Sequence, residues 1–143
     1  MSPRLKALRA VRGGRARRTG RSAEVVGALL LMAKGWRILG FRLKTRHGEI
    51  DLLAKRGRVL AVVEVKSRTS LEAALASVQP SQQARLRRAG EALATRRPGL
   101  AGLVVRLDMV ALAPRRWPRH IPDAWAGGGG APPTRNQGVV RRA

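Results

Sequence analysis

The stretches GEIDLL at residues 48–53 and VVEVK at residues 62–66 each carry two charged residues, two positions apart, inside an apolar run. Side chains alternate across a β-strand, so the two acids of the first stretch share a face, as do Glu64 and Lys66 of the second. Charges within apolar strands are costly unless they are paired or bound to a ligand. The two stretches therefore predict neighbouring strands that gather carboxylates at one place.

A turn centred on Arg56-Gly57 is predicted to join these strands as a hairpin. In that register Glu49 faces Glu64, and Asp51 lies diagonal to Glu64, with Cβ separations of about 5 Å and about 7–8 Å. Like charges that face each other destabilise a sheet, and a bound cation would remove the repulsion. The predicted geometry therefore favours a cation site.

The chemistry of the acids indicates which cation. Mg²⁺ and Mn²⁺ prefer oxygen ligands, and Mg²⁺ needs only one or two carboxylates beside the phosphate oxygens of a substrate. We therefore predict a metal site for phosphodiester hydrolysis, in which the three carboxylates converge on the ion and Lys66, at the rim, orients water or stabilises charge on the phosphate. The alternative is a plain salt bridge of Lys66 on a solvated sheet face, and the presence of two charged motifs in sequence favours the metal site.

The chain has 143 residues, a formal net charge of +22 and no cysteine, which predicts one domain without disulfides or thiolate metal sites. The net charge is +7 in residues 1–19, +10 in residues 20–113 and +5 in residues 114–143. Such a basic chain attracts polyanions through counterion release, which makes nucleic acid the expected partner. The alternative reading is a codon bias towards Arg.

No apolar run is long enough for a membrane span, and no signal peptide is recognisable, so we expect a cytoplasmic protein without a membrane partner. Residues 1–19 read as a basic disordered arm, and residues 114–143 as a disordered tail rich in Pro, Gly and Arg. Residues 20–113 remain as the folded domain.

Hydrophobic periodicity within this domain predicts a helix, three strands, a helix and a fourth strand, which is an α/β fold with a mixed sheet flanked by helices. The expected helices span 21–34 and 81–97, and the expected strands span 36–44, 49–54, 58–66 and 103–113. The first helix should bury Ala23, Val26, Leu30 and Ala33. Trp36 and Phe41 are expected in the core.

Five segments together resemble one known group, the YraN family: RSAE at 21–24, GWRIL at 35–39, RHGEIDL at 46–52, VEVKSR at 63–68 and RLDMV at 106–110. The resemblance covers about residues 20–112. That family belongs to the restriction-endonuclease-like, PD-(D/E)xK superfamily and is similar to archaeal Holliday junction resolvases. The resemblance implies a restriction-endonuclease-like αβββαβ core and a nuclease acting on DNA, including branched or junction DNA.

The resemblance also implies roles for single residues. Asp51 matches the first metal-binding acid, Glu64 the second acid and Lys66 the lysine of the superfamily motif. Glu24 matches an acid on the first helix that approaches the metal. Glu49 is an auxiliary acid, for which a salt bridge to a nearby arginine is the alternative.

Gln82 stands where the family usually has a lysine, which removes one phosphate-binding charge from the expected site. Arg85 and Arg88 belong to a cationic helix face and, with Arg46 and Arg68 near the acids, are the expected contacts to nucleic acid. Asp108 is expected to be structural, paired with a residue such as Arg106. Cutting two strands of a junction in register would require a homodimer, a prediction that rests on analogy alone.

Two other functions remain open at this stage. One is a catalytically silent nucleic-acid-binding module that acts as an accessory in DNA or RNA processing. The other is a basic RNA-associated scaffold, which would explain the charged ends of the chain but not acids inside apolar strands.

Overall fold

The structure is a computed structural model that describes residues 21–126. A five-stranded sheet forms its centre, with the strands side by side in the order in which they occur in the chain. They are β1 (Arg37–Thr45), β2 (Gly48–Arg56), β3 (Val59–Ser67), β4 (Val104–Leu112) and β5 (Arg119–Ile121). Only β3 and β4 run parallel to each other, so the sheet is mixed, as the sequence predicts.

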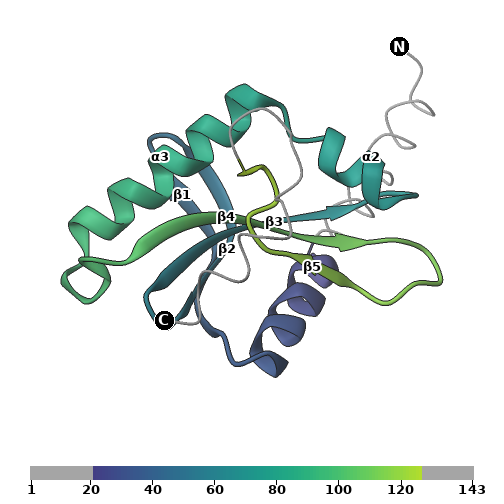
Figure 1. Ribbon diagram of the computed structural model, residues 1–143, viewed down its shortest axis with the longest axis horizontal. Helices are drawn as coiled ribbons and strands as arrows, with labels where there is room; N and C mark the ends of the chain where they lie inside the picture. The colour runs from purple at the N-terminus through teal and green to yellow at the C-terminus, as the bar shows by residue number, and fades with distance from the viewer. Residues whose placement is uncertain (1–20, 127–143) are drawn as a thin grey trace, which may run out of the picture.

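Helices cover both faces of the sheet (Figure 1). Residues 21–33 form the first helix, which lies on one face. On the other face lie α2 (Leu71–Ala76) and α3 (Pro80–Arg96), which is followed by a short 3₁₀ turn (Pro98–Leu100). Parallel neighbours need a long crossover, and the segment with α2 and α3 supplies it between β3 and β4.

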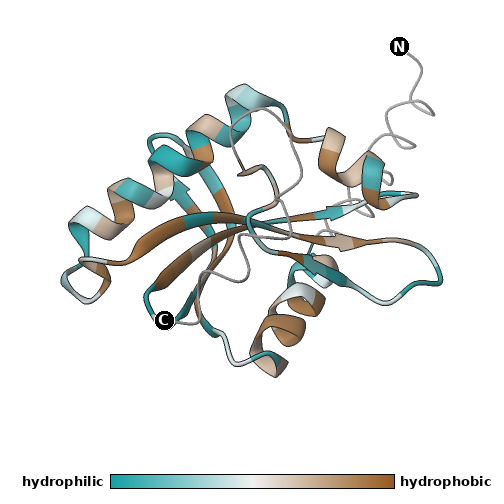
Figure 2. Cartoon of the chain, in the orientation of Figure 1, coloured by the Kyte–Doolittle hydropathy of each residue, from teal (hydrophilic) through white to brown (hydrophobic). Residues whose placement is uncertain are grey.

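The sheet carries a separate apolar core on each face, which appears as brown strands in Figure 2. Leu53, Leu60 and Leu107 are buried in the core under α2 and α3. Leu31 and Val63 belong to the core under the first helix. Burial on both faces explains why β3 reads as an almost continuous apolar run, in which a charge is conspicuous.

The hairpin register differs from the predicted one by two residues. Leu52 pairs with Val63, whereas the predicted register would pair it with Ala61. The turn consists of Gly57 and Arg58 rather than Arg56-Gly57, because Gly57 adopts the positive φ of 58° that a tight two-residue turn requires. Continued beyond the last pair, this register brings Asp51, and not Glu49, across from Glu64.

The buried face of the first helix overlaps the predicted one only in part. Gly27, Ala28 and Leu31 make its contact with the sheet. Leu30 is partly buried against the same core, whereas Val26 and Ala33 are exposed. A Cβ at Gly27 would lie 3.3 Å from Leu52, so the helix approaches the sheet through its smallest residues. Close approach of the backbones at Gly27 therefore decided which face of the helix meets the sheet.

Two further expectations about aromatic residues and the tail need correction. Phe41 is 47 % exposed, although Trp36 is buried as predicted. Residues 114–126, predicted to be disordered, contain β5, and Trp125 is buried with its Nε1 donating to the Leu75 carbonyl at 3.2 Å. Composition suggested disorder, but a short edge strand and one anchored indole are enough to hold this segment.

The predicted basic arm at residues 1–19 and the remainder of the predicted tail at residues 127–143 lie outside the described residues. Within residues 21–126, no helix is both long and apolar enough to cross a membrane.

Candidate metal and nucleic-acid site

The two predicted catalytic acids lie where β2 and β3 separate. The pairing of these strands ends at Leu52 and Val63, one residue before Asp51 and Glu64. Beyond that point the Asp51 carboxylate takes the place of a strand carbonyl, because its Oδ2 accepts a hydrogen bond from the Val65 amide at 2.9 Å. The side chain of Asp51 is therefore held rigidly beside β3.

Glu64 is buried on β3, with only 5 % of the residue exposed. Burial and the neighbouring charge of Asp51 raise the pKa of Glu64 to about 7, although the ammonium of Lys66 lowers it. The Lys66 Nζ lies 3.3 Å from Glu64 Oε1. The predicted pairing of Lys66 with an acid is thus present, but its ammonium does not offset the burial and the charge of Asp51 that raise the pKa of Glu64.

The pKa of Asp51 is raised as well. Burial is the main cause and the charge of Glu24 adds to it, while the Val65 amide and Lys66 act in the opposite direction. Two adjacent carboxylates that both resist ionisation form a site short of positive charge. A cation placed between them would favour the charged form of both.

Glu24 approaches the pair from the first helix and is itself buried. Its carboxylate accepts a hydrogen bond from Arg42 Nε at 2.7 Å, and this contact raises the pKa of Arg42. Arg42 has a φ of 48°, which is uncommon for a residue other than glycine and marks a constrained position in β1. Sequence reasoning missed Arg42, since nothing in an alternating strand signals a left-handed residue.

The fit of a metal ion depends on how many ligands stand together. Within residues 21–126, no three His, Asp or Glu side chains are arranged to hold a metal ion jointly. Asp51 and Glu64 remain as a pair of buried carboxylates, and Mg²⁺ is bound in many sites by one or two carboxylates with water and phosphate oxygens. The residues therefore fit a two-carboxylate site, with Glu24 engaged by Arg42.

A cavity of about 300 Å³ opens over the acidic pair, between the β1–β2 turn and the start of α3. Its lining includes five of the predicted site residues, Glu49, Asp51, Glu64, Gln82 and Arg85. Arg85 lines it from the next turn of α3, and His47 lines it from the β1–β2 turn. The cavity therefore combines acids at its base with polar and basic groups at its sides.

The remaining predicted nucleic-acid contacts, Arg46, Arg68 and Arg88, are not among the residues that line this cavity. Arg46 is exposed in the β1–β2 turn, and Arg88 is exposed on α3 one turn after Arg85. Arg68 follows β3 and donates to the Ser67 carbonyl at 2.7 Å. All three guanidinium groups belong to residues open to solvent, and Arg46 and Arg88 enter into none of the hydrogen bonds or ion pairs found in residues 21–126.

Asp108 lies apart from this site, on the face of the sheet that carries the first helix. Arg106 donates to both of its oxygens at 2.8 and 2.9 Å, which confirms the predicted pairing. His120 Nε2 lies 2.8 Å from Oδ2, and the Asp123 amide donates to Oδ1 at 3.0 Å. Burial alone would raise the pKa of Asp108, but these hydrogen bonds outweigh it and lower the pKa.

Comparison with known proteins places the chain among relatives of similar length. Residues 23–112, more than half of the chain, match the model of the uncharacterised protein family UPF0102. A UPF0102 protein of Caulobacter vibrioides (strain NA1000 / CB15N) is 64 % identical over 120 residues, which cover 84 % of this chain and 96 % of the relative. A UPF0102 protein of Parvibaculum lavamentivorans is 50 % identical over 131 residues, covering 87 % of this chain and 98 % of the relative. The chain therefore belongs to the UPF0102 family.

Proposed function

We propose that this protein is a divalent-metal-dependent nuclease that acts on DNA, with a core of the restriction-endonuclease-like, PD-(D/E)xK kind. The observation that carries the proposal is the pair of buried carboxylates, Asp51 and Glu64, both with raised pKa values and with Lys66 beside them. An α/β fold that buries acids next to each other destabilises itself unless a ligand completes the site.

Asp51 and Glu64 are the residues that would hold Mg²⁺ or Mn²⁺. When bound, such an ion supplies Lewis-acid stabilisation of a phosphate and lowers the pKa of a bound water. Lys66 presents a compact positive charge 3.3 Å from Glu64, where it orients the water or neutralises charge on the phosphate. Arg42 holds Glu24 in place beside the pair, so Glu24 acts on the site through its charge.

The charge around the cavity supports a polyanionic substrate. Arg85 lines the cavity and Arg88 extends the same exposed face of α3, while Arg46 flanks the opening from the β1–β2 turn. Contacts of this type bind the phosphate backbone without reading its sequence. We therefore propose a structure-selective rather than a sequence-selective nuclease; junction cutting in register would require two copies of the chain.

A second function is favoured by one observation. Glu24 is occupied by Arg42, and Gln82 lines the cavity in place of a cation, so the site has fewer free ligands and less positive charge than a nuclease could use. A catalytically silent module that binds nucleic acid would tolerate both features. Substitution of one metal ligand separates the two functions.

The test compares the protein with Asp51→Asn on labelled four-way junction, flap, single-stranded and duplex DNA, in Mg²⁺, Mn²⁺ or EDTA. A nuclease requires metal, and Asp51→Asn should lower cleavage at least ~100-fold, because groups that merely support a metal ligand already contribute 10–100-fold. DNA binding should remain, since the carboxylate repels phosphate.

Glu91→Gln is the matched control, since Glu91 is an exposed acid on α3 outside the cavity. It should cut at the rate of the unmodified protein. Binding without cleavage on every substrate and in both metals would instead identify the silent binding module.

A further inference from the structure

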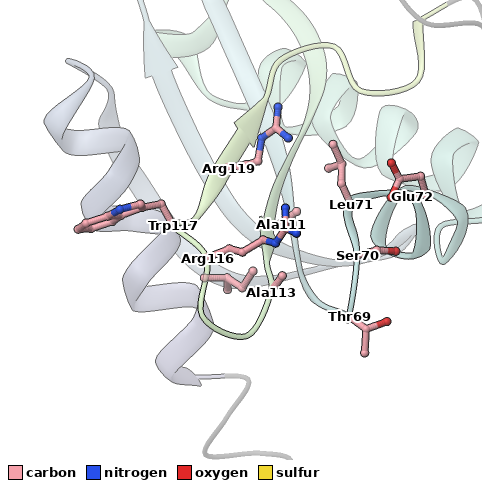
Figure 3. Close-up of a pocket in the computed structure, with 10 residues that line it drawn as sticks. Thr69, Ser70, Leu71, Glu72, Ala111, Ala113, Arg116, Trp117 and Arg119 are labelled. Atoms are coloured by element: carbon pink, nitrogen blue, oxygen red, sulfur yellow. The ribbon is translucent and has the colours of Figure 1, made fainter.

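A second cavity, of about 310 Å³, lies on the β4–β5 side of the sheet, whereas the acidic site lies on β2 and β3. It opens between the loop that follows β3 and the connection from β4 to β5 (Figure 3). Its volume is at the lower end of the ~300–1,000 Å³ typical of small-ligand pockets. The cavity contains none of the residues assigned to the acidic site.

The sheet register places this cavity directly next to Lys66. Lys66 pairs with Ala111 on β4, and Ala111 pairs with Arg119 on β5, so the three side chains share one face of the sheet. Ala111 lines the cavity and lies in register between two cations, Lys66 and Arg119. Two strand spacings of ~4.8 Å separate the backbones of Lys66 and Arg119 by roughly 10 Å.

The cavity combines an aromatic face with positive charge. Trp117 is 89 % exposed, whereas Trp36 and Trp125 are each only 4 % exposed. Figure 3 shows its indole at the outer edge of the cavity, directed away from Ser70, with Arg116 and Arg119 nearer to Ser70. Neither arginine takes part in the ion pairs found within residues 21–126.

These groups match the parts of a nucleotide. An exposed indole offers a surface on which a base can stack, and guanidinium groups bind phosphate. A base inside a duplex is already stacked on its neighbours, so only an unpaired base can reach the indole. The roughly 10 Å between the backbones of Lys66 and Arg119 suits a nucleic-acid strand that continues from a phosphate at the acidic site.

We propose that this cavity binds an unpaired nucleotide of the strand whose phosphate lies at Asp51 and Glu64, with its base on Trp117 and its phosphate on Arg116 and Arg119. The inference rests on the proposed function and narrows it. The substrate class is then nucleic acid with an unpaired segment beside the cleaved bond, such as a flap or a gap, and not continuous duplex.

The experiment measures binding without cleavage, by titrating the full chain with a short oligothymidylate in EDTA. Trp117 is the one exposed tryptophan of the three in the chain, so stacking should quench the intrinsic fluorescence. Anisotropy of the labelled oligonucleotide should show roughly 5- to 100-fold weaker binding for Trp117→Ala. Trp117→Phe should retain most of the affinity, because it keeps an aromatic face.

The charged part of the site has its own matched pair of variants. Arg116→Gln with Arg119→Gln should reduce the slope of log affinity against log salt by roughly 0.7, the value for one neutralised phosphate of a single strand. Arg58→Gln with Arg97→Gln removes the same charge at exposed positions outside the cavity and should leave the slope nearly unchanged. Equal losses in both double variants would overturn the assignment of the arginines.

Three outcomes separate this inference from the proposed function. Trp117→Ala binding within twofold of the unmodified protein would overturn the cavity assignment, even if metal-dependent cleavage is found. Trp117-dependent binding in a protein that cuts nothing would support the cavity and reject the nuclease. If thymidine monophosphate quenches the fluorescence as strongly as the oligonucleotide, the nucleotide need not belong to a nucleic-acid strand. That result would overturn the proposal and indicate a site for free nucleotides.

Discussion

Two groups of buried side chains, the Asp51–Glu64 pair and Asp108 with its hydrogen-bond partners, lie on neighbouring strands of one sheet. The pKa values of their carboxylates are shifted in opposite directions. Val63 on β3 pairs with Asp108 on β4, so Glu64 and Asp108 are separated by a single step in register. Asp108 is fully buried and its pKa is lowered, whereas Glu64 is nearly as buried and its pKa is raised to about 7. Burial is common to both, so the difference arises from the partners.

Asp108 receives hydrogen bonds from Arg106 and the Asp123 amide and contacts His120, which together satisfy both of its oxygens. Glu64 has one cation at 3.3 Å and a second carboxylate as a neighbour. The satisfied cluster is complete within the chain and serves the fold. The Asp51–Glu64 pair is the unsatisfied cluster, because Lys66 does not offset the burial and the neighbouring negative charge that raise both pKa values.

The largest effect on stability should come from breaking the satisfied cluster. Asp108→Asn leaves the partly buried Arg106 without its counter-ion, and loss of one partner of a buried pair costs about 3–5 kcal/mol. Urea unfolding at pH 7 should show this loss. Because the pKa of Asp108 is lowered in the folded state, its stabilisation is present above the unfolded pKa and the difference should shrink in acid.

Asp123→Asn is the matched control, because only the backbone amide of Asp123 bonds to Asp108 and Asn tolerates its φ of 50°. It should change stability by less than about 0.5 kcal/mol. A neutral Asp108→Asn would show that the two clusters do not differ as argued.

The unsatisfied cluster should respond with the opposite sign. The folded pKa of Glu64, about 7, lies above its ordinary value of 4.5, so the folded state holds the proton more tightly and the free energy of unfolding falls as pH rises between these values. In EDTA at pH 8, Glu64→Gln should therefore stabilise the protein by about 1–3 kcal/mol, part of which is offset by the lost contact with Lys66.

The measurement is the urea midpoint of both proteins from pH 4.5 to pH 8. The unmodified protein should lose stability across this range more steeply than Glu64→Gln, and the two curves should converge at the acidic end. Parallel curves would mean that Glu64 is satisfied after all. Glu91→Gln, at an exposed position, should not change the slope.

The smallest effect should come from the arginine beside the unsatisfied cluster. Arg85 lines the acidic cavity without an ion pair or hydrogen bond of its side chain within residues 21–126, in contrast to Arg106 beside Asp108. Arg85→Gln should leave stability within about 0.5 kcal/mol and lower the salt slope of duplex binding by ~0.9, the value for one phosphate contact. Arg96→Gln, at the far end of α3, controls for charge. Equal salt slopes for the unmodified protein and both variants would show that the N-terminal half of α3 does not contact nucleic acid.

Much of the fold was predictable from local pattern. The strands containing Asp51 and Glu64 and the helix after Pro80 lie where periodicity and turn residues place them, because these signals are local. The convergence of the two acids was predictable too, but the register was not. Gly57 begins the turn in place of Arg56, and this small change replaced Glu49 by Asp51 opposite Glu64.

Other features of the site depend on contacts between distant segments. Arg42 reaches Glu24 through a left-handed backbone conformation, which no alternating pattern can indicate. His120 and Trp125 come from a stretch whose composition resembles a disordered tail, yet they contact Asp108 and the end of α2. Their order arises from partners far away in the chain.

The amino-acid sequence by itself determined the α/β class, the order of the first four strands along the chain and the family, because apolar periodicity and motif spacing are properties of neighbouring residues. Only the tertiary structure decided which acids oppose each other, which face of the first helix is buried and which carboxylate is satisfied. The pKa of a buried acid depends on the groups packed around it, and in this protein those groups come from strands and helices that are distant in sequence.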